Sequence, residues 1–145
     1  MAYGNLIELF LVNGTADSLV VAELSNWNGK AIKIPRIEVS SCDLDDITQA
    51  GVYFLFCKED DGSDSVYIGE AENVKDRLVQ HLRDYQSEKE KYYWNTTVIF
   101  IGRDLNKALI RYLENRFVEI ARENKRYLVL TKIKIASLIV AFFKI

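Results

Sequence analysis

The sequence predicts an α/β fold in which a central antiparallel sheet of about three strands is flanked by helices. Two short runs, residues 51–57 and 65–69, are rich in the Val, Tyr, Phe and Ile that strands favour. The polar segment KEDDGS between them has turn composition, so the pair predicts a hairpin. A helix over about 71–85 follows, and then a second strand–helix unit over 96–101 and 105–124. Helices that cover a small sheet make an α/β sandwich.

The first 48 residues predict a β-rich N-terminal extension. Apolar runs at 6–12 and 19–24 flank an Asn13-Gly14 step, which suggests a first hairpin. Residues 31–35 alternate apolar and polar side chains like another strand, and the only proline, Pro35, is expected to end it. Residues 36–49 have the composition of a loop or a short helix.

The predicted helix over 71–85 carries an apolar stripe with two chemically useful residues beside it. Val74, Leu78 and Leu82 recur every four residues, with charged residues between them. Arg77 and His81 are also four residues apart, so they lie on one face of this helix. An arginine and a histidine are therefore predicted to stand next to the tyrosines of the preceding hairpin.

The second strand–helix unit places one carboxylate near the core. Residues 96–101 (TTVIFI) are β-branched and apolar, as in a buried strand, and Asp104 is the expected N-cap of the helix that follows. Glu114 comes one residue beyond the apolar stripe of that helix, so its carboxylate is expected at the edge of the core. The stripe comprises Leu109, Tyr112, Leu113, Phe117 and Ile120.

The last segment, residues 127–145, is apolar. Residues 135–143 carry no charge, but nine residues are too few for a membrane span, which needs about 20. This segment is expected either to be a buried strand or helix of the core or to be the exposed remnant of a longer chain.

Composition predicts one soluble domain. The chain has 145 residues, of which 49% are apolar and 28% are charged. A net charge of −2 predicts no strong overall attraction to nucleic acid or to an anionic membrane, so any DNA contact must use a local patch. Cys42 and Cys57 have no metal-ligand spacing, which favours the reducing cytoplasm, and the first residues show no signal peptide.

Several residues in a fixed order resemble the GIY-YIG nuclease family. They are Gly51-Val52-Tyr53, Tyr67-Ile68-Gly69, Arg77, His81 and Glu114. The two tyrosines are 14 residues apart and Arg77 follows ten residues after the second, and the resemblance covers about residues 50–126. It implies a GIY-YIG-like nuclease domain over 49–126. The stretch 25–36 also resembles a bacterial subgroup whose longer members carry a further C-terminal domain, so truncation or a shortened paralogue is expected.

The resemblance implies a metal-dependent endonuclease that hydrolyses DNA phosphodiester bonds. Glu114 would hold Mg²⁺ or Mn²⁺, and the planar fork of Arg77 would bind a phosphate. Tyr53 is the family's usual general-base candidate, and Tyr67 would orient water or phosphate. Family members differ over which tyrosine or histidine takes the proton, so the role of His81 stays open. These groups are expected to converge on one concave surface.

Each site residue also has a structural alternative. Tyr53 and Tyr67 would suit half-buried strand positions, His81 a solvated helix face, and Arg77 an ion pair with Asp76 or Asp84. Glu114 would likewise suit pairing with Arg111 or Lys107. The family tends to place a lysine just after the second motif, where this chain has Glu70.

Basic residues near the predicted site suggest weak, salt-sensitive contact with DNA. Acidic residues are interleaved with them, so another domain or a protein partner is expected to choose the target. Tyr92, Tyr93 and Trp94 would either stack on a base or pack in the core. The alternative function is a catalytically inactive GIY-YIG-like module that binds nucleic acid or protein. The predicted nucleic-acid-binding residues are Lys75, Arg83, Lys107 and Arg111.

Overall fold

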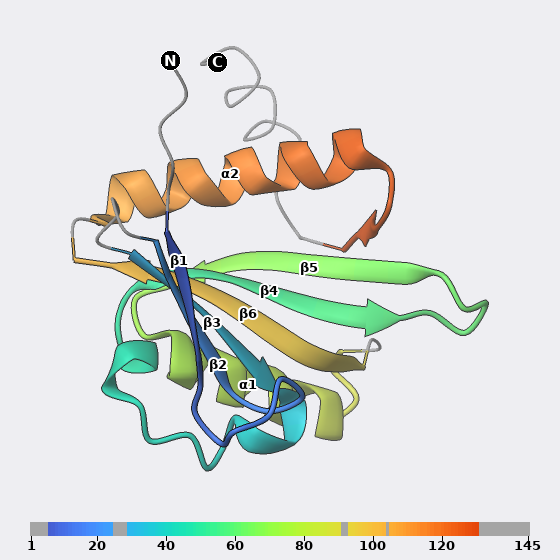
Figure 1. Ribbon diagram of the computed structural model, residues 1–145. Helices are drawn as coiled ribbons and strands as arrows, with labels where there is room; N and C mark the ends of the chain where they lie inside the picture. The colour runs from blue at the N-terminus through green and yellow to red at the C-terminus, as the bar shows by residue number, and fades with distance from the viewer. Residues whose placement is uncertain (1–5, 25–28, 91–92, 104, 131–145) are drawn as a thin grey trace.

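The computed structural model describes residues 6–24, 29–90, 93–103 and 105–130. These residues form a seven-stranded sheet with one α-helix on each face (Figure 1). The strand order is β1-β2-β3-β6-β4-β5-β7, and all neighbouring pairs are antiparallel except β5 and β7. The strands are β1 (Ile7–Leu11), β2 (Val20–Leu24), β3 (Gly29–Pro35), β4 (Gly51–Lys58), β5 (Asp64–Ala71), β6 (Trp94–Gly102) and β7 (Leu128–Val129). The helices are α1 (Val74–Gln86) and α2 (Lys107–Asn124).

The central hairpin β4–β5 and the strand β6 are the three strands that the sequence predicts for the core. The predicted sheet of about three strands was nevertheless wrong, because the sheet has seven. The outer edge of β6 pairs with the whole of β3, from Gly29 opposite Gly102 to Pro35 opposite Thr96. This pairing satisfies the backbone of β6 and adds β1, β2 and β3 to the same sheet.

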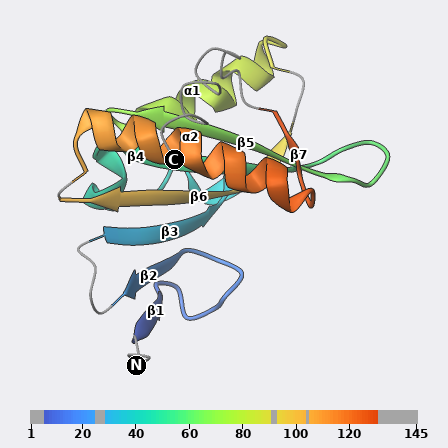
Figure 2. The ribbon, with the colours of Figure 1, turned by 90° about the horizontal axis from the view of Figure 1, so that it is seen from above.

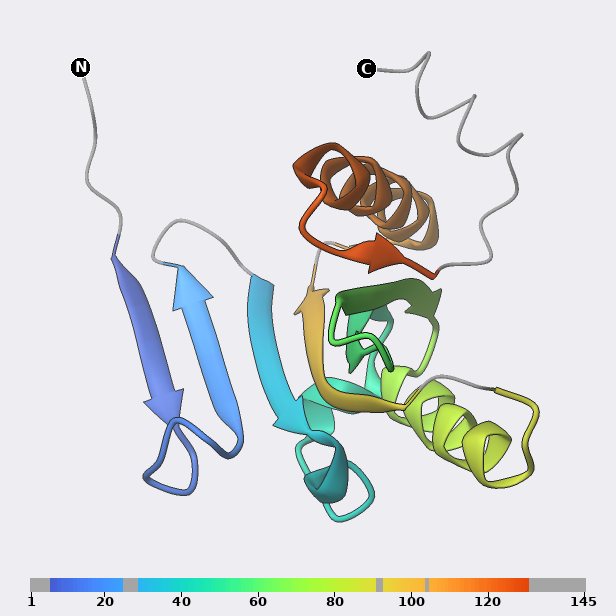
Figure 3. The same ribbon diagram turned by 90° about the vertical axis from the view of Figure 1, so that its right-hand side faces the viewer.

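The two faces of the sheet carry separate apolar clusters. Successive side chains of a strand point to opposite faces, so Tyr53 and Leu55 pack toward α1. Val52 and Phe54 pack toward α2 in the other cluster. Figure 3 shows α1 and α2 on either side of the central strands. Any side chain of β4 or β5 is thereby assigned to one helix or the other.

Helix α1 begins at Val74, because Ala71 still belongs to β5 and Asn73 is the N-cap. The Asn73 side chain accepts a hydrogen bond from the Asp76 amide at 3.1 Å, which satisfies one free amide of the first turn. Val74, Leu78 and His81 are the buried residues of the helix. The sequence predicted the helix and its apolar stripe, and placed its start about three residues too early.

Helix α2 begins at Lys107, and its N-cap is Asn106, whose side chain accepts from the Leu109 amide at 2.8 Å. The expected cap, Asp104, lies outside the described residues. The predicted apolar stripe was correct at Leu113 and Phe117 but wrong at its other three residues, because Leu109, Tyr112 and Ile120 are exposed. The side chains that face the sheet are those of Ile110, Leu113, Phe117, Val118 and Ala121.

The N-terminal strands lie away from both helices. Figure 2 shows β1 and β2 on the side of the sheet remote from α1 and α2. Between β3 and β4 the chain forms two short 3₁₀ helices, η1 (Arg36–Glu38) and η2 (Asp45–Thr48), where a loop or a short helix was predicted. The apolar segment 135–143 lies outside the described residues. Within the described ranges, no helix is long and apolar enough to cross a membrane.

Candidate active site

Tyr53 and Tyr67 lie side by side on the α1 face of the central hairpin. In the register of β4 and β5, Leu55 is opposite Tyr67 and Tyr53 is opposite Gly69, so the two tyrosines are diagonal neighbours. Their ring centroids are 6.1 Å apart and the rings are nearly parallel, at 25°. Tyr53 is 1% exposed and Tyr67 is 8% exposed. Both are therefore more buried than the half-buried strand positions considered from the sequence.

Gly69 makes room for the ring of Tyr53. A Cβ atom at Gly69 would lie 2.5 Å from the Tyr53 hydroxyl oxygen and 3.0 Å from Cε1 of Tyr67. No side chain is tolerated at those distances without moving the tyrosine. The glycine of the second motif thus has a specific role, which is to let the Tyr53 ring lie across the neighbouring strand.

His81 is held between Tyr53 and an acidic residue that sequence reasoning missed. Its Nε2 lies 2.8 Å from the Tyr53 hydroxyl, and its Nδ1 lies 2.6 Å from Oε1 of Glu90. When the imidazole is neutral, Nδ1 donates to the Glu90 carboxylate and Nε2 accepts a hydrogen bond from the Tyr53 hydroxyl. The His81 residue is 0% exposed, so the solvated alternative was wrong. The result is a buried chain of hydrogen bonds from Glu90 through His81 to Tyr53.

Glu90 reaches His81 because the chain reverses sharply after α1. Glu88 has a positive φ of 61°, and the amides of Lys89 and Glu90 both donate to the carbonyl of Asp84. This turn brings the Glu90 side chain, which is 9% exposed, back against the helix. In the sequence Glu90 stands in the charged run QSEKEK, which carries no signal that distinguishes it from its solvated neighbours.

Arg77 completes the group on this face. Burial by itself lowers the pKa of Arg77, but the negative charge that Tyr53 and Tyr67 would carry, with a hydrogen bond that Arg77 donates to Tyr67, raises it overall. The half-buried guanidinium of Arg77 therefore lies close to the two tyrosines. No ion pair joins Arg77 to Asp76 or Asp84, both of which are described residues.

Glu114 lies on the opposite face of the sheet. It is on the sheet-facing side of α2, one turn after Ile110, whereas Tyr53, Tyr67 and His81 face α1. Burial, then the negative charge of Glu70, raises the pKa of Glu114 to about 7, and Arg111 opposes this shift. The structure thus brings four of the five predicted site residues together and places the fifth beside Glu70. The prediction that all five converge on one concave surface was therefore wrong for Glu114, because α2 packs on the other face of the sheet.

A comparison with protein families gives this arrangement a name. The family model described as the GIY-YIG catalytic domain matches residues 49–127, which is more than half of the chain. The chain belongs to the GIY-YIG family. The match runs from two residues before β4 to the residue before β7 and includes all five predicted site residues. Searches of curated proteins and of solved structures found no match. Membership in the GIY-YIG family indicates a nuclease.

A GIY-YIG nuclease is expected to use a divalent cation, and two carboxylates of this domain suit one. Glu70 and Glu114 approach each other between β5 and α2, where Oε1 of Glu70 is 3.5 Å from Nε of Arg111. The other oxygen, Oε2 of Glu70, is buried and has no hydrogen-bond partner. Mg²⁺ typically binds through one or two carboxylates and keeps several waters. The described residues include no cluster of three ligand side chains, and this carboxylate pair would supply two of the oxygen ligands of such an ion.

The predicted nucleic-acid-binding residues differ in whether their charged groups already have a partner within the domain. Lys75 donates to the carbonyl of Cys42 at 2.6 Å. Lys107 pairs with Glu72 at 3.6 Å, and Arg111 pairs with Glu70. Arg83 has neither a side-chain hydrogen bond nor an ion pair with the residues that the structure describes. Among the aromatic residues, Trp94 is fully buried, Tyr93 is 49% exposed, and Tyr92 lies outside the described ranges.

Proposed function

We propose that this GIY-YIG domain is a metal-dependent endonuclease that hydrolyses phosphodiester bonds of DNA. One observation carries the proposal: His81 is bonded on one side to Tyr53 and on the other to Glu90, with Arg77 beside the tyrosines. This arrangement supplies a base and a cation for an anion in one place, as phosphate chemistry requires.

The hydrogen-bond chain allows Tyr53 to act as a general base. Its hydroxyl gives a proton to Nε2 of His81, and the Glu90 carboxylate stabilises the imidazolium that forms. The Tyr53 phenolate, stabilised by Arg77, then accepts a proton from water, and the resulting hydroxide attacks phosphorus. The bond from phosphorus to the leaving oxygen breaks, that oxygen takes a proton from water, and the proton held on His81 neutralises the hydroxide left behind. General-base catalysis of this kind contributes about 10²–10⁴-fold in rate.

Glu114 and Glu70 are the residues that would hold Mg²⁺ or Mn²⁺. When bound, the ion supplies neutralisation of the negative charge on the phosphate oxygens. The tyrosines and the two carboxylates meet β5 at neighbouring residues: Tyr53 lies over Gly69 on one face, and the next residue, Glu70, points to α2 on the other face. The substrate phosphate is therefore expected at this end of β5.

A second function is favoured by the position of Glu114. Because that carboxylate lies on the other face of the sheet from Tyr53, a domain that binds nucleic acid or protein without cleaving DNA would also fit. In such a module Glu70 and Arg111 form an ion pair that stabilises the contact of β5 with α2. Metal-dependent cleavage distinguishes the two functions.

The deciding experiment is nicking of supercoiled plasmid by the purified chain with Mg²⁺, Mn²⁺ or EDTA. We expect nicking that requires the metal and is lost in Glu114→Ala and in Tyr53→Phe. The matched control is Glu123→Ala, which removes an exposed carboxylate from the same helix. A folded wild-type chain that nicks with neither metal would refute the nuclease and support the binding module.

The cellular setting is also a proposal. Cys42 and Cys57 are both free and buried, which supports the cytoplasm as the compartment. We further propose a protein partner or an additional domain for target choice, since most of the basic residues near the site are already paired. Assignment to the bacterial subgroup rests on the resemblance of residues 25–36 and stays a prediction.

A further inference from the structure

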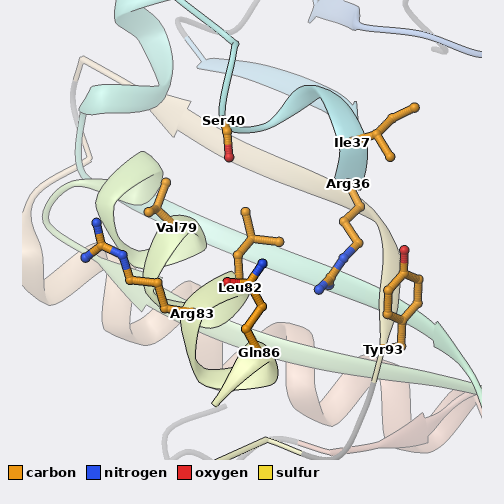
Figure 4. Close-up of a pocket in the computed structure, with 8 residues that line it drawn as sticks. All are labelled: Arg36, Ile37, Ser40, Val79, Leu82, Arg83, Gln86 and Tyr93. Carbon is orange, nitrogen blue, oxygen red and sulfur yellow. The ribbon is translucent and has the colours of Figure 1, made fainter. Parts of the chain in front are cut away.

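A polar cavity lies on the same face of the sheet as the tyrosines, between η1 and the C-terminal half of α1. Its volume is about 400 Å³. Figure 4 shows the side chains of Arg36 and Arg83 toward its two ends, with Ser40 pointing toward the space between them. Gln86 and Tyr93 also line the cavity, and none of its lining residues is acidic. In a chain of net charge −2 this is a local positive site.

Arg36 is fixed in position by aromatic rings. Its guanidinium carbon lies 4.1 Å from the ring centroid of Tyr93, 4.8 Å from that of Trp94 and 5.1 Å from that of Tyr85. One guanidinium nitrogen donates to the carbonyl of Trp94 at 3.2 Å. Rings contact the planar faces of a guanidinium, and its N–H donors lie in the plane. The remaining N–H donors of Arg36 make no ion pair with a carboxylate of the described residues. They are therefore available to bind an acceptor in the cavity.

Arg83 supplies the second positive charge. It stands on α1 with Val79, Leu82 and Gln86, which line the same side of the cavity. Unlike Lys75, Lys107 and Arg111, it makes no side-chain hydrogen bond or ion pair within the described residues. Two guanidinium groups that lack carboxylate partners, together with hydroxyl and amide groups, form a recognition surface for a phosphate anion.

We propose that this cavity binds a backbone phosphate of the DNA substrate. The identity of the substrate rests on the proposed function, while the cavity itself is separate from the catalytic residues. On the helical wheel of α1, the cavity residues Val79, Leu82 and Arg83 lie on one flank and Arg77 lies on the other. A helix is about 10–12 Å wide with its side chains, so a duplex that crosses α1 contacts both flanks. The cavity thereby fixes the direction in which DNA crosses the domain.

The test measures DNA binding without cleavage. A labelled duplex is titrated in EDTA at several salt concentrations with the wild-type chain, Arg83→Gln, Arg36→Lys and the control Arg122→Gln, an exposed arginine of α2. We expect Arg83→Gln to weaken binding several-fold and to reduce the slope of log K against log salt by about 1, as loss of one phosphate contact requires. Arg36→Lys keeps the charge and loses the stacked fork, so it should weaken binding with little change in slope.

The outcomes separate this inference from the nuclease proposal. If the duplex binds as expected but the chain never nicks plasmid, the cavity stands and the nuclease fails. If the chain nicks plasmid while Arg83→Gln and Arg36→Lys bind DNA like Arg122→Gln, the cavity proposal is overturned. Failure of the folded wild-type chain to bind duplex at low salt also overturns it. Thermal melting of each variant identifies loss of fold. If Arg36→Lys is destabilised, Arg83→Gln still tests the proposal, because Arg83 is exposed and its replacement should leave the fold intact.

Discussion

Replacing Glu114 with glutamine is expected to change how the stability of the domain depends on pH. Burial and Glu70 raise the pKa of Glu114 from 4.5 to about 7. At about 1.36 kcal/mol for each pKa unit, a shift of this size corresponds to about 3.4 kcal/mol for a fully buried group. Glu114 is only partly buried, so solvent screening reduces the expected effect to about 1.5 kcal/mol.

The sign of this pH dependence follows from which state of the protein, native or unfolded, holds the Glu114 proton. Between pH 4.5 and about 7 the native protein keeps a proton on Glu114 that the unfolded chain releases. The native state therefore binds more protons in this window, and the free energy of unfolding falls as pH rises through it. Above pH 7 both states are ionised and this contribution stays constant. A glutamine is neutral at every pH and avoids the loss.

Urea unfolding at a series of pH values between 4.5 and 8 measures this effect. The free energy of unfolding of Glu114→Gln should rise relative to that of the wild type by about 1.5 kcal/mol across the series. Glu123→Gln, an exposed change on the same helix, should show no such rise. A difference between Glu114→Gln and wild type that stays constant with pH would refute the assignment of a buried, proton-holding carboxyl to Glu114.

Three further substitutions test the other parts of the site. Glu90→Gln should lower the nicking rate at least tenfold and change the pH profile of nicking, because His81 loses the charge that stabilises its imidazolium. An unchanged pH profile would show that Glu90 takes no part in the proton transfer. Gly69→Ala should lower the free energy of unfolding by about 1–3 kcal/mol, because the added Cβ would lie against the Tyr53 hydroxyl. Gly102→Ala is the control and should cost less, since the nearest atom to its added Cβ would be 3.3 Å away. Equal losses in urea unfolding would contradict the close approach of Tyr53 to Gly69. Lys75→Met should lower the free energy of unfolding by about 1.5 kcal/mol, because the carbonyl of Cys42 loses a charged donor. The affinity of this variant for duplex DNA should stay close to that of the wild type.

The parts of the fold that the sequence predicted are those that depend on near neighbours. The hairpin β4–β5 and helix α1 follow from turn composition and a four-residue repeat. The number of strands did not follow, because the pairing of β3 with β6 joins residues from 61 (Pro35 and Thr96) to 73 (Gly29 and Gly102) positions apart and leaves no periodic signal in either strand. Sheet membership is a property of strand edges, and the sequence of a strand says little about which edge it meets.

The site divides in the same way. Tyr53, Tyr67, Arg77 and His81 lie together, as their spacing predicted, because alternation on the strands and a four-residue step on α1 fix their faces. Glu90 was missed, since its position depends on the positive φ of Glu88 and not on a motif. The phase of α2 was also misjudged: Tyr112 and Ile120 are apolar enough to suggest a core stripe, yet the face that packs on β4 and β5 is that of Ile110 and Val118. The corrected phase moves Glu114 from the margin of the stripe onto it.

The alternation of β5 explains how one strand joins two clusters. Gly69 must be small because Tyr53 lies over it, and the next residue, Glu70, points to the opposite face and meets Arg111. The parallel pairing with β7 covers Ser65 and Val66, so Gly69 and Glu70 lie beyond it on the strand. A phosphate at this margin of the sheet would have the tyrosines on one side and the carboxylates on the other. Cleavage by the wild-type chain therefore requires that the phosphate to be hydrolysed lies at this margin of the sheet.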